Sequence, residues 1–572
     1  MKRFLAVLLA VIIAVSAFSV AAFAFGSGEM KVLVMADPHL SVKDSFSATV
    51  PHRNADSEDF FHAASGGKLP DESYALLKEF LKEAAQTDAH YLLIPGDLTE
   101  GGKREAHEVL IKELTNFQNA TGKKVYVVPG NHDFYAGITP KEFAELYKEL
   151  GYDPAEMDAY DEKTASYTVD LSDGYRLLAV NSCKEGYSEH GMNAYKLNWI
   201  EEQCKKAQQD GKKLIAMMHH NVLDHFALAD MFHKGATIPE SVGLRELLAN
   251  YGVKYVLTGH SHENDIAAYT AKNGNTIYDI LTGALICYPN PYREITFGKD
   301  VKVTTKNITS VDTSLVPKGM SAKAQELLNN DFPLYAYNMS KVSIRKTFTG
   351  LLTPGTLKNI FGVNANNRPD IANTLDKIGN NIKEVSEMPF YVKDQLQRGK
   401  SIEAIAGRYL VTLPKSDYAD LMDLMVRLYI AHCKGDENFP SYSTEMVLLT
   451  RATSVAITYA LKDVSDKEFV DLLTFMAQKL GVSNVSFVKF VGNVAARFDG
   501  AEYFVARVLT PTFSGIFSDD GPLDLNVTLP PYEQIKEPNK GAWQGILDFN
   551  KKVNDFWRTI FAFMPGAGKW FK

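Results

Sequence analysis

Histidine, aspartate and asparagine recur in five short blocks in the first half of the chain. Each block follows a short apolar run, and four of the five contain histidine. In chain order they are Asp37-Pro38-His39, Gly96-Asp97, Gly130-Asn131-His132-Asp133, His219-His220 and Gly259-His260-Ser261-His262. Imidazole nitrogens and carboxylate or amide oxygens are ligands that divalent metal ions accept in proteins. The blocks therefore predict a metal site, provided that the fold brings them together.

The segments between the blocks indicate how they are positioned. Strands are expected at residues 31–36, 91–95, 125–128, 176–180, 214–218 and 254–257, and helices at 71–86, 104–119, 194–208 and 239–250. This alternation predicts an α/β layer with mainly parallel strands. Open α/β sheets bind their ligands just beyond the carboxyl ends of the strands. Because every block follows such an end, we expect the five blocks to form one site.

The donor set is large enough for two divalent ions. A carboxylate can bridge two ions about 3.5–4 Å apart, and Asp97 is the expected bridge because it is the only block carboxylate without a histidine in its block. Two cations would cancel the repulsion between a phosphate ester and hydroxide, and would lower the pKa of a shared water so that hydroxide attacks near neutral pH. The leaving alkoxide then needs a proton, and His132, next to the ligand Asn131, is placed to give one.

The five blocks, in this order over about residues 31–300, resemble the calcineurin-like metallophosphoesterase superfamily. The resemblance implies a metallophosphoesterase-type α/β sandwich that binds two divalent ions, which would be Mn, Fe or Zn. It implies two ligand sets that share one carboxylate: Asp37, His39, Asp97 and His262 for the first ion, and Asp97, Asn131, His219 and His260 for the second. It also implies that His132 is the proton donor or stabilises the transition state, and that Asp133 orients it; the alternative for Asp133 is that it stabilises the turn.

The chain departs from the family pattern at two places. Glu100 stands where purple acid phosphatases carry a tyrosine, so a tyrosinate–iron site is not expected. The usual proline after the fourth block is absent, and His220 is interpreted either as a substrate contact or as a plain hydrogen-bonding histidine. His52 and Arg53, in the long loop 41–69, are further substrate-contact candidates; the alternative is that they are solvated loop residues.

The N-terminus predicts export. Residues 1–26 are interpreted as a signal peptide or an N-terminal membrane anchor, since Lys2 and Arg3 precede an uncharged run from Phe4 to Ala24. The body of the protein is then secreted, periplasmic or associated with the cell envelope, and is membrane-anchored if the leader is not cleaved. Residues 191–199, together with a helical region after the catalytic part, are similar to exported bacterial cyclic-nucleotide phosphodiesterase-like members of the superfamily.

The chain is expected to divide after the leader into three parts. Residues 27–310 form the catalytic domain and residues 311–540 a mainly helical, all-α C-terminal domain. Residues 541–572 are predicted to form an amphipathic, aromatic-rich helix that docks on the helical domain or contacts a membrane surface. Thirteen of the fourteen histidines lie between residues 39 and 262, so the metal chemistry is assigned to the catalytic domain.

Composition limits the partners. The net charge of −8 argues against a nucleic acid duplex, which needs a basic surface. The substrate is expected to be a small-molecule phosphoester or a phosphoester of the cell envelope. The leading hypothesis is an exported dinuclear phosphodiesterase. The alternatives are a phosphomonoesterase, a phospholipid or envelope phosphodiesterase, and a cell-envelope scaffold without activity.

Overall fold

The computed structural model describes most of the chain between residues 29 and 532. The described residues are 29–42, 65–183, 191–226, 235, 237–316, 322–392, 400–408, 410–435, 439–479 and 524–532. The leader at 1–26, the loop residues His52 and Arg53 and the terminal helix at 541–572 lie outside these residues. Among the described helices, none combines the length and the apolar character that a membrane span requires.

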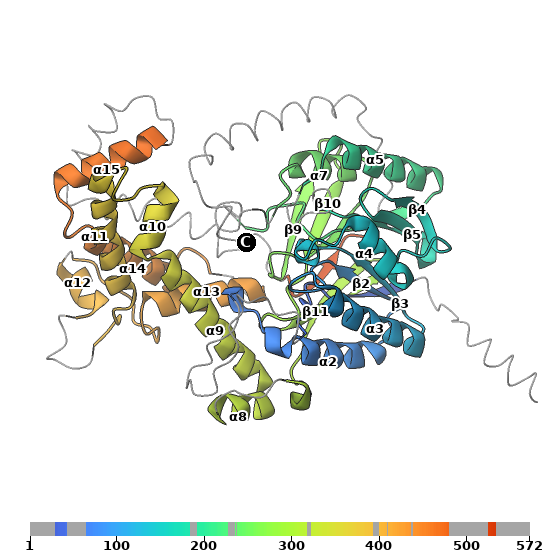
Figure 1. Cartoon of the computed structure of the whole chain (residues 1–572), viewed down its shortest axis with the longest axis horizontal. Helices are drawn as coiled ribbons and strands as arrows, with labels where there is room; N and C mark the ends of the chain where they lie inside the picture. The colour runs from blue at the N-terminus through green and yellow to red at the C-terminus, as the bar shows by residue number, and fades with distance from the viewer. Residues whose placement is uncertain are drawn as a thin grey trace, which may run out of the picture.

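Two β-sheets form the centre of the α/β part (Figure 1). The first sheet has the order β13-β12-β11-β1-β2-β3; β1, β2 and β3 are parallel, and the other neighbours are antiparallel. Its strands are β1 (Met30–Val34), β2 (Tyr91–Pro95), β3 (Lys124–Val128), β11 (Pro291–Phe297), β12 (Val301–Asn307) and β13 (Asn526–Leu529). The predicted strands at 31–36, 91–95 and 125–128 are confirmed.

The second sheet has the order β4-β5-β6-β7-β8-β10-β9, with β6, β7, β8 and β10 parallel to one another. Its strands are β4 (Met157–Asp161), β5 (Ser166–Asp170), β6 (Tyr175–Ala179), β7 (Lys213–Met217), β8 (Tyr255–Thr258), β9 (Asp265–Thr270) and β10 (Thr276–Leu281). The parallel strands of each sheet carry the sequence blocks at their carboxyl ends, because each block begins within three residues after its strand.

The sheets pack on each other and helices cover their outer sides. The first sheet shares one hydrophobic cluster with Leu177 and Ile215 of the second sheet, whereas Leu178 and Ala216 belong to a separate cluster under α5 and α7. Adjacent residues of a strand face opposite sides, so the second sheet lies between these two cores. The helices are α2 (Ser73–Ala85), α3 (Arg104–Thr121), α4 (Pro140–Leu146), α5 (Ala194–Gln209) and α7 (Ser241–Asn250). This arrangement confirms the predicted α/β sandwich.

A helical region follows the α/β part, as predicted. Its helices are α8 (Ala322–Asn330), α9 (Phe332–Leu351), α10 (Pro354–Phe361), α11 (Pro369–Ser386), α12 (Ile402–Arg408), α13 (Leu421–Lys434), α14 (Thr444–Ala460) and α15 (Asp466–Lys479). Side-chain caps mark several starts; Asp331 accepts a hydrogen bond from the Leu334 amide at the start of α9, and Asp420 accepts one from the Asp423 amide at the start of α13.

The helical region is joined to the α/β part by a continuous core. Phe332, Tyr335 and Met339 of α9 belong to the same hydrophobic cluster as the first sheet. Strand β13 pairs antiparallel with β12, although it lies within residues 311–540, which are predicted to be mainly helical. The alternation of polar and apolar residues from Asp524 to Leu529 is typical of a strand, and its partner is the edge of a sheet about 220 residues earlier.

Candidate metal centre

The loops after the strands adopt unusual backbone conformations at the site. Asp37, His39, Asp97, His260 and His262 have φ angles between 39° and 75°. Residues other than glycine adopt this left-handed region rarely, and such strain concentrates at functional sites. Two glycines complete the loops: a Cβ on Gly130 would lie 2.2 Å from Asp97 Oδ1, and one on Gly259 would lie 2.2 Å from Asp37 Oδ2. Only glycine permits these approaches.

The structure brings Asp37, His39, Asp97 and His262 together as a first donor group. One donor atom from each lies within 4.8 Å of the others. His39 Nε2 is 3.1 Å from His262 Nε2, 3.5 Å from Asp97 Oδ2 and 3.8 Å from Asp37 Oδ1. The four residues come from the loops after β1, β2 and β8, so the site spans both sheets.

Asp97, Asn131, His219 and His260 form a second donor group beside the first. His219 Nε2 lies 3.1 Å from Asn131 Oδ1, 3.1 Å from His260 Nδ1 and 3.3 Å from Asp97 Oδ2. The Asn131 amide nitrogen donates to the Tyr135 hydroxyl at 3.0 Å, which leaves the amide oxygen facing the group. All seven residues that the sequence predicts as ligands therefore lie at one site.

Asp97 joins the two groups through a single oxygen. Its Oδ1 accepts a hydrogen bond from the backbone amide of His132 at 2.8 Å. Its Oδ2 faces His39 Nε2 at 3.5 Å on one side and His219 Nε2 at 3.3 Å on the other. The backbone contact fixes the carboxylate so that Oδ2 can serve both groups, which suits the bridging role expected for Asp97.

The chemistry of these groups fits divalent cations. Imidazole nitrogens that converge at 3.1 Å beside buried carboxylates are donors that a divalent ion can share. Burial, and then the charge of Lys68, lower the pKa of His39 to about 4, so its ring is neutral and able to ligate. Burial also lowers the pKa of His219, but the charges of Asp97 and Asp37 outweigh it and raise the pKa to about 9. The surroundings of His219 thus favour a cation.

His132 stands at the open edge of the site. Its side chain is 19% exposed, whereas those of His39 and His219 are 0% exposed. His132 Nδ1 lies 2.7 Å from the carbonyl oxygen of Glu100, so Nδ1–H donates to this oxygen. Its Nε2 lies 3.9 Å from Asp97 Oδ2. The ring therefore presents Nε2 next to both donor groups, where a substrate can reach it.

Asp133 has a different role from the one expected. Its carboxylate accepts hydrogen bonds from the Gly130 amide at 2.9 Å, the Leu98 amide at 3.1 Å and the Thr99 amide at 2.9 Å. These contacts tie the loop after β3 to the loop after β2. The expectation that Asp133 orients the His132 ring is corrected, because the Glu100 carbonyl holds that ring. The fully buried Asp133 lies beneath the loops and stabilises them.

His220 is buried next to the second donor group. Its Nδ1 lies 2.7 Å from Ser182 Oγ, and its ring centroid lies 4.3 Å from that of His260. A donor nitrogen of His220 also lies within 4.8 Å of donor atoms of His219 and His260. The contact with Ser182 fits the hydrogen-bonding interpretation, and the position beside His260 keeps His220 at the wall of the site.

Three features around the site were not predicted from the sequence. They are the positions of Lys68 and Tyr135 and the orienting role of Glu100. The Glu100 carboxylate lies 2.7 Å from His39 Nδ1 and 2.9 Å from Lys68 Nζ. The ring centroid of Tyr135 lies 4.4 Å from that of His132. The block order drew attention to position 100, but no local pattern distinguishes Lys68 from other lysines of the chain.

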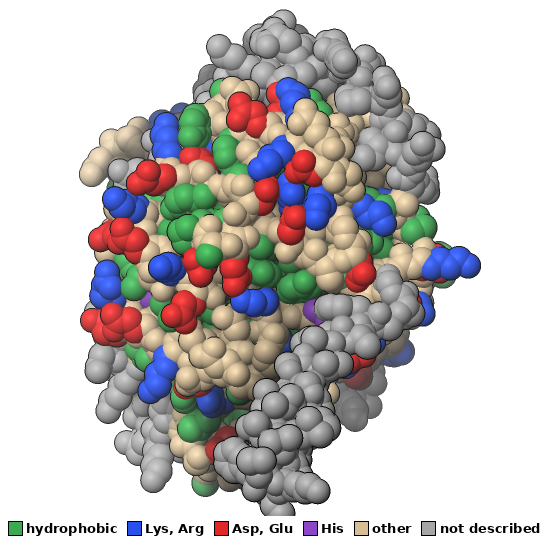
Figure 2. All heavy atoms as spheres, turned by 90° about the vertical axis from the view of Figure 1, so that its right-hand side faces the viewer, with side chains coloured by type: hydrophobic (Ala, Val, Ile, Leu, Met, Phe, Trp, Pro, Cys, Tyr) green, Lys and Arg blue, Asp and Glu red, His purple; other side chains and the backbone are tan. Residues whose placement is uncertain are grey.

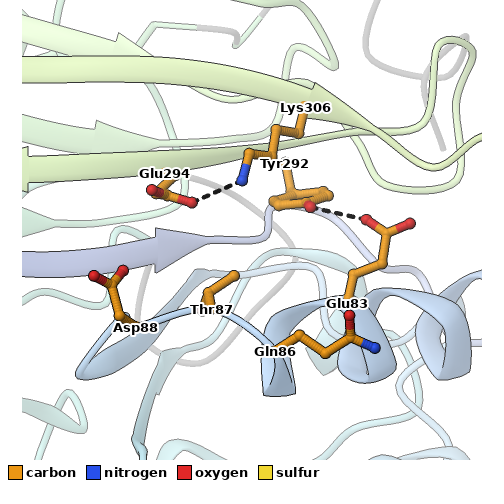
Figure 3. Close-up of a pocket in the computed structure, with 7 residues that line it drawn as sticks. All are labelled: Glu83, Gln86, Thr87, Asp88, Tyr292, Glu294 and Lys306. Carbon is orange, nitrogen blue, oxygen red and sulfur yellow. Dashed lines mark hydrogen bonds and ion pairs between the residues drawn. The ribbon is translucent and has the colours of Figure 1, made fainter.

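A separate cavity of 480 Å³ lies between α2 and strands β11 and β12 (Figure 3). It is lined by Glu83, Gln86, Thr87, Asp88, Tyr292, Glu294 and Lys306. Its polar groups pair with one another: the Tyr292 hydroxyl donates to Glu83 at 2.8 Å, and Lys306 pairs with Glu294 at 2.9 Å. None of the block residues lines this cavity, so the candidate chemistry lies elsewhere.

Comparison with known proteins supports the same assignment. Residues 30–264 match the calcineurin-like phosphoesterase family, which confirms the resemblance seen in the blocks. A cAMP/cGMP dual specificity phosphodiesterase of Mycobacterium tuberculosis (strain CDC 1551 / Oshkosh) is 25% identical over 198 residues, which cover 34% of this chain and 54% of that protein. The chain thus spans about half the length of the curated relative it matches.

Solved structures give more distant likenesses. A dimetal phosphatase from Danio rerio is 13% identical, with a TM-score of 0.37 over 49% of this chain and 95% of that chain. A purple acid phosphatase from yellow lupin seeds is also 13% identical, with a TM-score of 0.33 over 49% of this chain and 52% of that chain.

Proposed function

We propose that this protein, whose residues 30–264 match the calcineurin-like phosphoesterases, is a two-metal hydrolase of phosphodiesters. The observation that carries the proposal is the pair of donor groups that share Asp97 Oδ2, with His132 beside them. Nitrogen and oxygen donors of this kind accept Mn, Fe or Zn. The family match supports a metal-dependent phosphoester hydrolase, and the choice of diesters follows the activity for which the distant mycobacterial relative is named.

The bound ions would neutralise the phosphate charge and make water a nucleophile near neutral pH. The protein residues do the remaining work. Asp37, Asp97 and Asn131 supply oxygen donors, and the histidines of the two groups supply nitrogen donors. The backbone amide of His132 keeps Asp97 Oδ2 between the groups. The loops are fixed before any ligand arrives, because Asp133 ties them together through three backbone amides.

His132 is assigned as the proton donor to the leaving alkoxide. Its Nδ1–H is engaged by the Glu100 carbonyl, so Nε2 is the nitrogen that holds and releases the transferred proton. A positioned general acid contributes about 10²–10⁴-fold to rate, and most for leaving groups of high pKa. The partial exposure of the ring gives the ester oxygen access to Nε2.

A substrate panel tests the proposal. The full-length protein would be stripped with a chelator, reconstituted with Mn²⁺, Fe²⁺ or Zn²⁺, and assayed on bis(p-nitrophenyl) phosphate, p-nitrophenyl phosphate, cyclic nucleotides and phospholipid head-group esters. We expect hydrolysis of diesters that depends on added metal. A preference for p-nitrophenyl phosphate or for lipid esters would select one of the two alternative substrate classes. Full activity without metal would refute the two-metal site, and a wild-type protein that binds no metal would favour an inactive scaffold.

The proposal includes export, which the leader sequence supports. The face of the α/β part in Figure 2 mixes acidic and basic side chains among the described residues drawn there, with no continuous basic stripe to suit a nucleic acid duplex. Ala22-Phe23-Ala24, within the leader at 1–26, fits a small-x-small cleavage site, so we expect the mature protein to begin at Phe25. N-terminal sequencing of protein from the cell envelope or medium checks this. An intact leader in the membrane fraction would identify an anchor instead, and protein confined to the cytoplasm would contradict export.

A further inference from the structure

Glu100 contacts two different functional histidines with two different parts of the residue. Its carboxylate oxygen Oε2 lies 2.7 Å from Nδ1 of the ligand His39, and its backbone carbonyl oxygen lies 2.7 Å from Nδ1 of His132. An imidazole that donates from Nδ1 has its Nε2 lone pair free to bind metal, which is how outer partners fix the tautomer and direction of a ligand. One residue therefore sets the ring direction of both a metal ligand and the proton donor.

Lys68 holds the Glu100 side chain in this position. The ammonium of Lys68 lies 2.9 Å from Glu100 Oε2, and the Lys68 side chain is 10% exposed. A partly buried carboxylate without a cation would be costly, so the pair keeps Glu100 charged beside His39. Lys68 comes from a segment distant in sequence from the blocks, which raises the question of what fixes it there.

Helix α9 of the helical region fixes the segment that carries Lys68. The Ser340 hydroxyl donates to the Gly67 carbonyl at 3.1 Å, and the Gly67 amide donates to the Ser343 hydroxyl at 3.2 Å. On the other side, the Leu69 amide donates to the Ile286 carbonyl at 2.9 Å. Both serines are buried. The segment is thus held between α9 and the loop after β10, and its lysine points at the metal centre.

We propose that Glu100 is a positioning residue for His39 and His132, and that α9 supports it through Lys68. The helical region is then a structural part of the metal centre rather than an appendage. This inference rests on the proposed function, since it concerns the same two-metal site. Glu100, which stands where purple acid phosphatases carry a tyrosine, thereby has a defined role.

The main test is the charge-neutral double variant Lys68→Met/Glu100→Leu. Removing both members of a buried ion pair is far milder for folding than removing one, and it leaves the net charge near the ions unchanged. The matched control is Lys78→Met/Glu113→Leu, which removes a pair 2.6 Å apart between α2 and α3. Calorimetric titration of chelator-stripped, full-length protein with Mn²⁺ measures affinity directly, and circular dichroism checks folding.

We expect the affinity for one of the two ions to fall about 10–100-fold in the double variant, as is usual when an outer partner of a ligand is lost. The control pair should stay within about twofold of wild type. Glu100→Gln, which keeps an acceptor for His39 Nδ1–H, should lie between wild type and the double variant. The deficit in turnover should shrink when Mn²⁺ is added in excess, because the carbonyl that holds His132 is part of the backbone.

A second variant tests the contribution of α9. Ser340→Ala/Ser343→Ala removes both hydroxyls that hold Gly67, and Thr347→Ala is its control because the Thr347 hydroxyl donates within the helix, to the Ser343 carbonyl. We expect weaker Mn²⁺ binding in the serine variant only, by up to about tenfold. Wild-type affinity in the folded Lys68→Met/Glu100→Leu protein would overturn the positioning role, and wild-type affinity in the serine variant would overturn the role of α9. A wild-type protein that binds no Mn²⁺ would instead refute the proposed function.

Discussion

This fold contains two clusters of buried histidine and aspartate side chains. The clusters differ in the groups that their histidine nitrogens face. The first cluster is the metal centre. The second, which we call the His225 cluster, consists of His225, Asp265 and Asp279. His225 Nδ1 lies 2.5 Å from Asp265 Oδ2 and its Nε2 lies 3.5 Å from Asp279 Oδ2. Each nitrogen of this ring faces a carboxylate.

The direction of the histidine nitrogens distinguishes the two clusters. Burial lowers the pKa of His225, but the charges of Asp265 and Asp279 outweigh it and raise the pKa to about 10. Its imidazolium therefore supplies the positive charge internally. In the metal centre, His39 Nε2 faces His262 Nε2, so two nitrogens converge on a place that one ion can occupy. The same residue types thus form a structural ion cluster in one place and a cation site in the other.

The metal centre and the His225 cluster should differ most when Asp97, the carboxylate shared by the two donor groups, is removed. In Asp97→Ala both donor groups lose their common oxygen, so we expect both metal ions to be lost. Activity should fall by about 10⁴-fold or more, to the level of the chelator-treated protein. Elemental analysis and turnover of bis(p-nitrophenyl) phosphate measure the two effects. A variant that keeps two ions per chain would show that Asp97 is not the bridge.

A smaller loss is expected from His132→Ala, which should separate proton transfer from metal binding. The metal content should stay at the wild-type level, and the rate should fall about 10²–10⁴-fold, more for esters whose leaving groups have a high pKa. A series of aryl phosphodiesters that differ in leaving-group pKa measures this dependence. An equal loss across the series would assign His132 to substrate binding instead.

A substitution in the His225 cluster should change the stability of the protein and not its metal content. Asp265→Asn breaks a buried ion pair, so we expect the free energy of unfolding to fall by about 3–5 kcal/mol. Urea denaturation of the wild-type and variant proteins gives this difference, and elemental analysis should find the same metal stoichiometry in both. Loss of metal from this variant would mean that the two clusters are one coupled site.

The stability of the His225 cluster should also depend on pH. The pKa of His225 is about 10 in the folded protein and about 6.5 in an unfolded chain. The stability that the imidazolium contributes is complete below pH 6.5 and is lost as the pH rises to about 10. The stability difference between the metal-free wild type and His225→Gln should therefore narrow across this window. A difference that is constant with pH would show that His225 is neutral in the fold.

The sequence predicted the blocks and their strands because these signals are local. A run such as 91–95 followed by Gly96-Asp97 indicates a strand and a ligand within seven residues. The partners of the ligands were not predictable in the same way. Lys68 lies in a segment that contacts α9 and the loop after β10, and the sequence does not indicate which distant helix packs on which loop.

The roles of neighbouring acids were also beyond local reasoning. Asp133 is adjacent to His132 in the sequence and Glu100 is 32 residues away, yet the Glu100 carbonyl holds the His132 ring because of the loop geometry. His225 shows the same limit, because the sequence around a loop histidine does not indicate whether its ring faces two carboxylates or the solvent. Residue type and spacing identify which groups gather at strand ends, but the direction of each ring is set by tertiary packing.

The first sheet cannot be completed during synthesis until strand β13 has been made. The first sheet is closed at one edge by residues 526–529, and the buried Arg293 guanidinium donates to the Asp524 carbonyl at 3.0 Å. Ribosomes release the chain from its N-terminus, so the metal ligands emerge more than 250 residues before this last strand. A chain that stopped near residue 310 would leave β12 as an open edge, which promotes aggregation. Completion of the α/β part therefore waits until residues 526–529, which follow the helical region, have been synthesised.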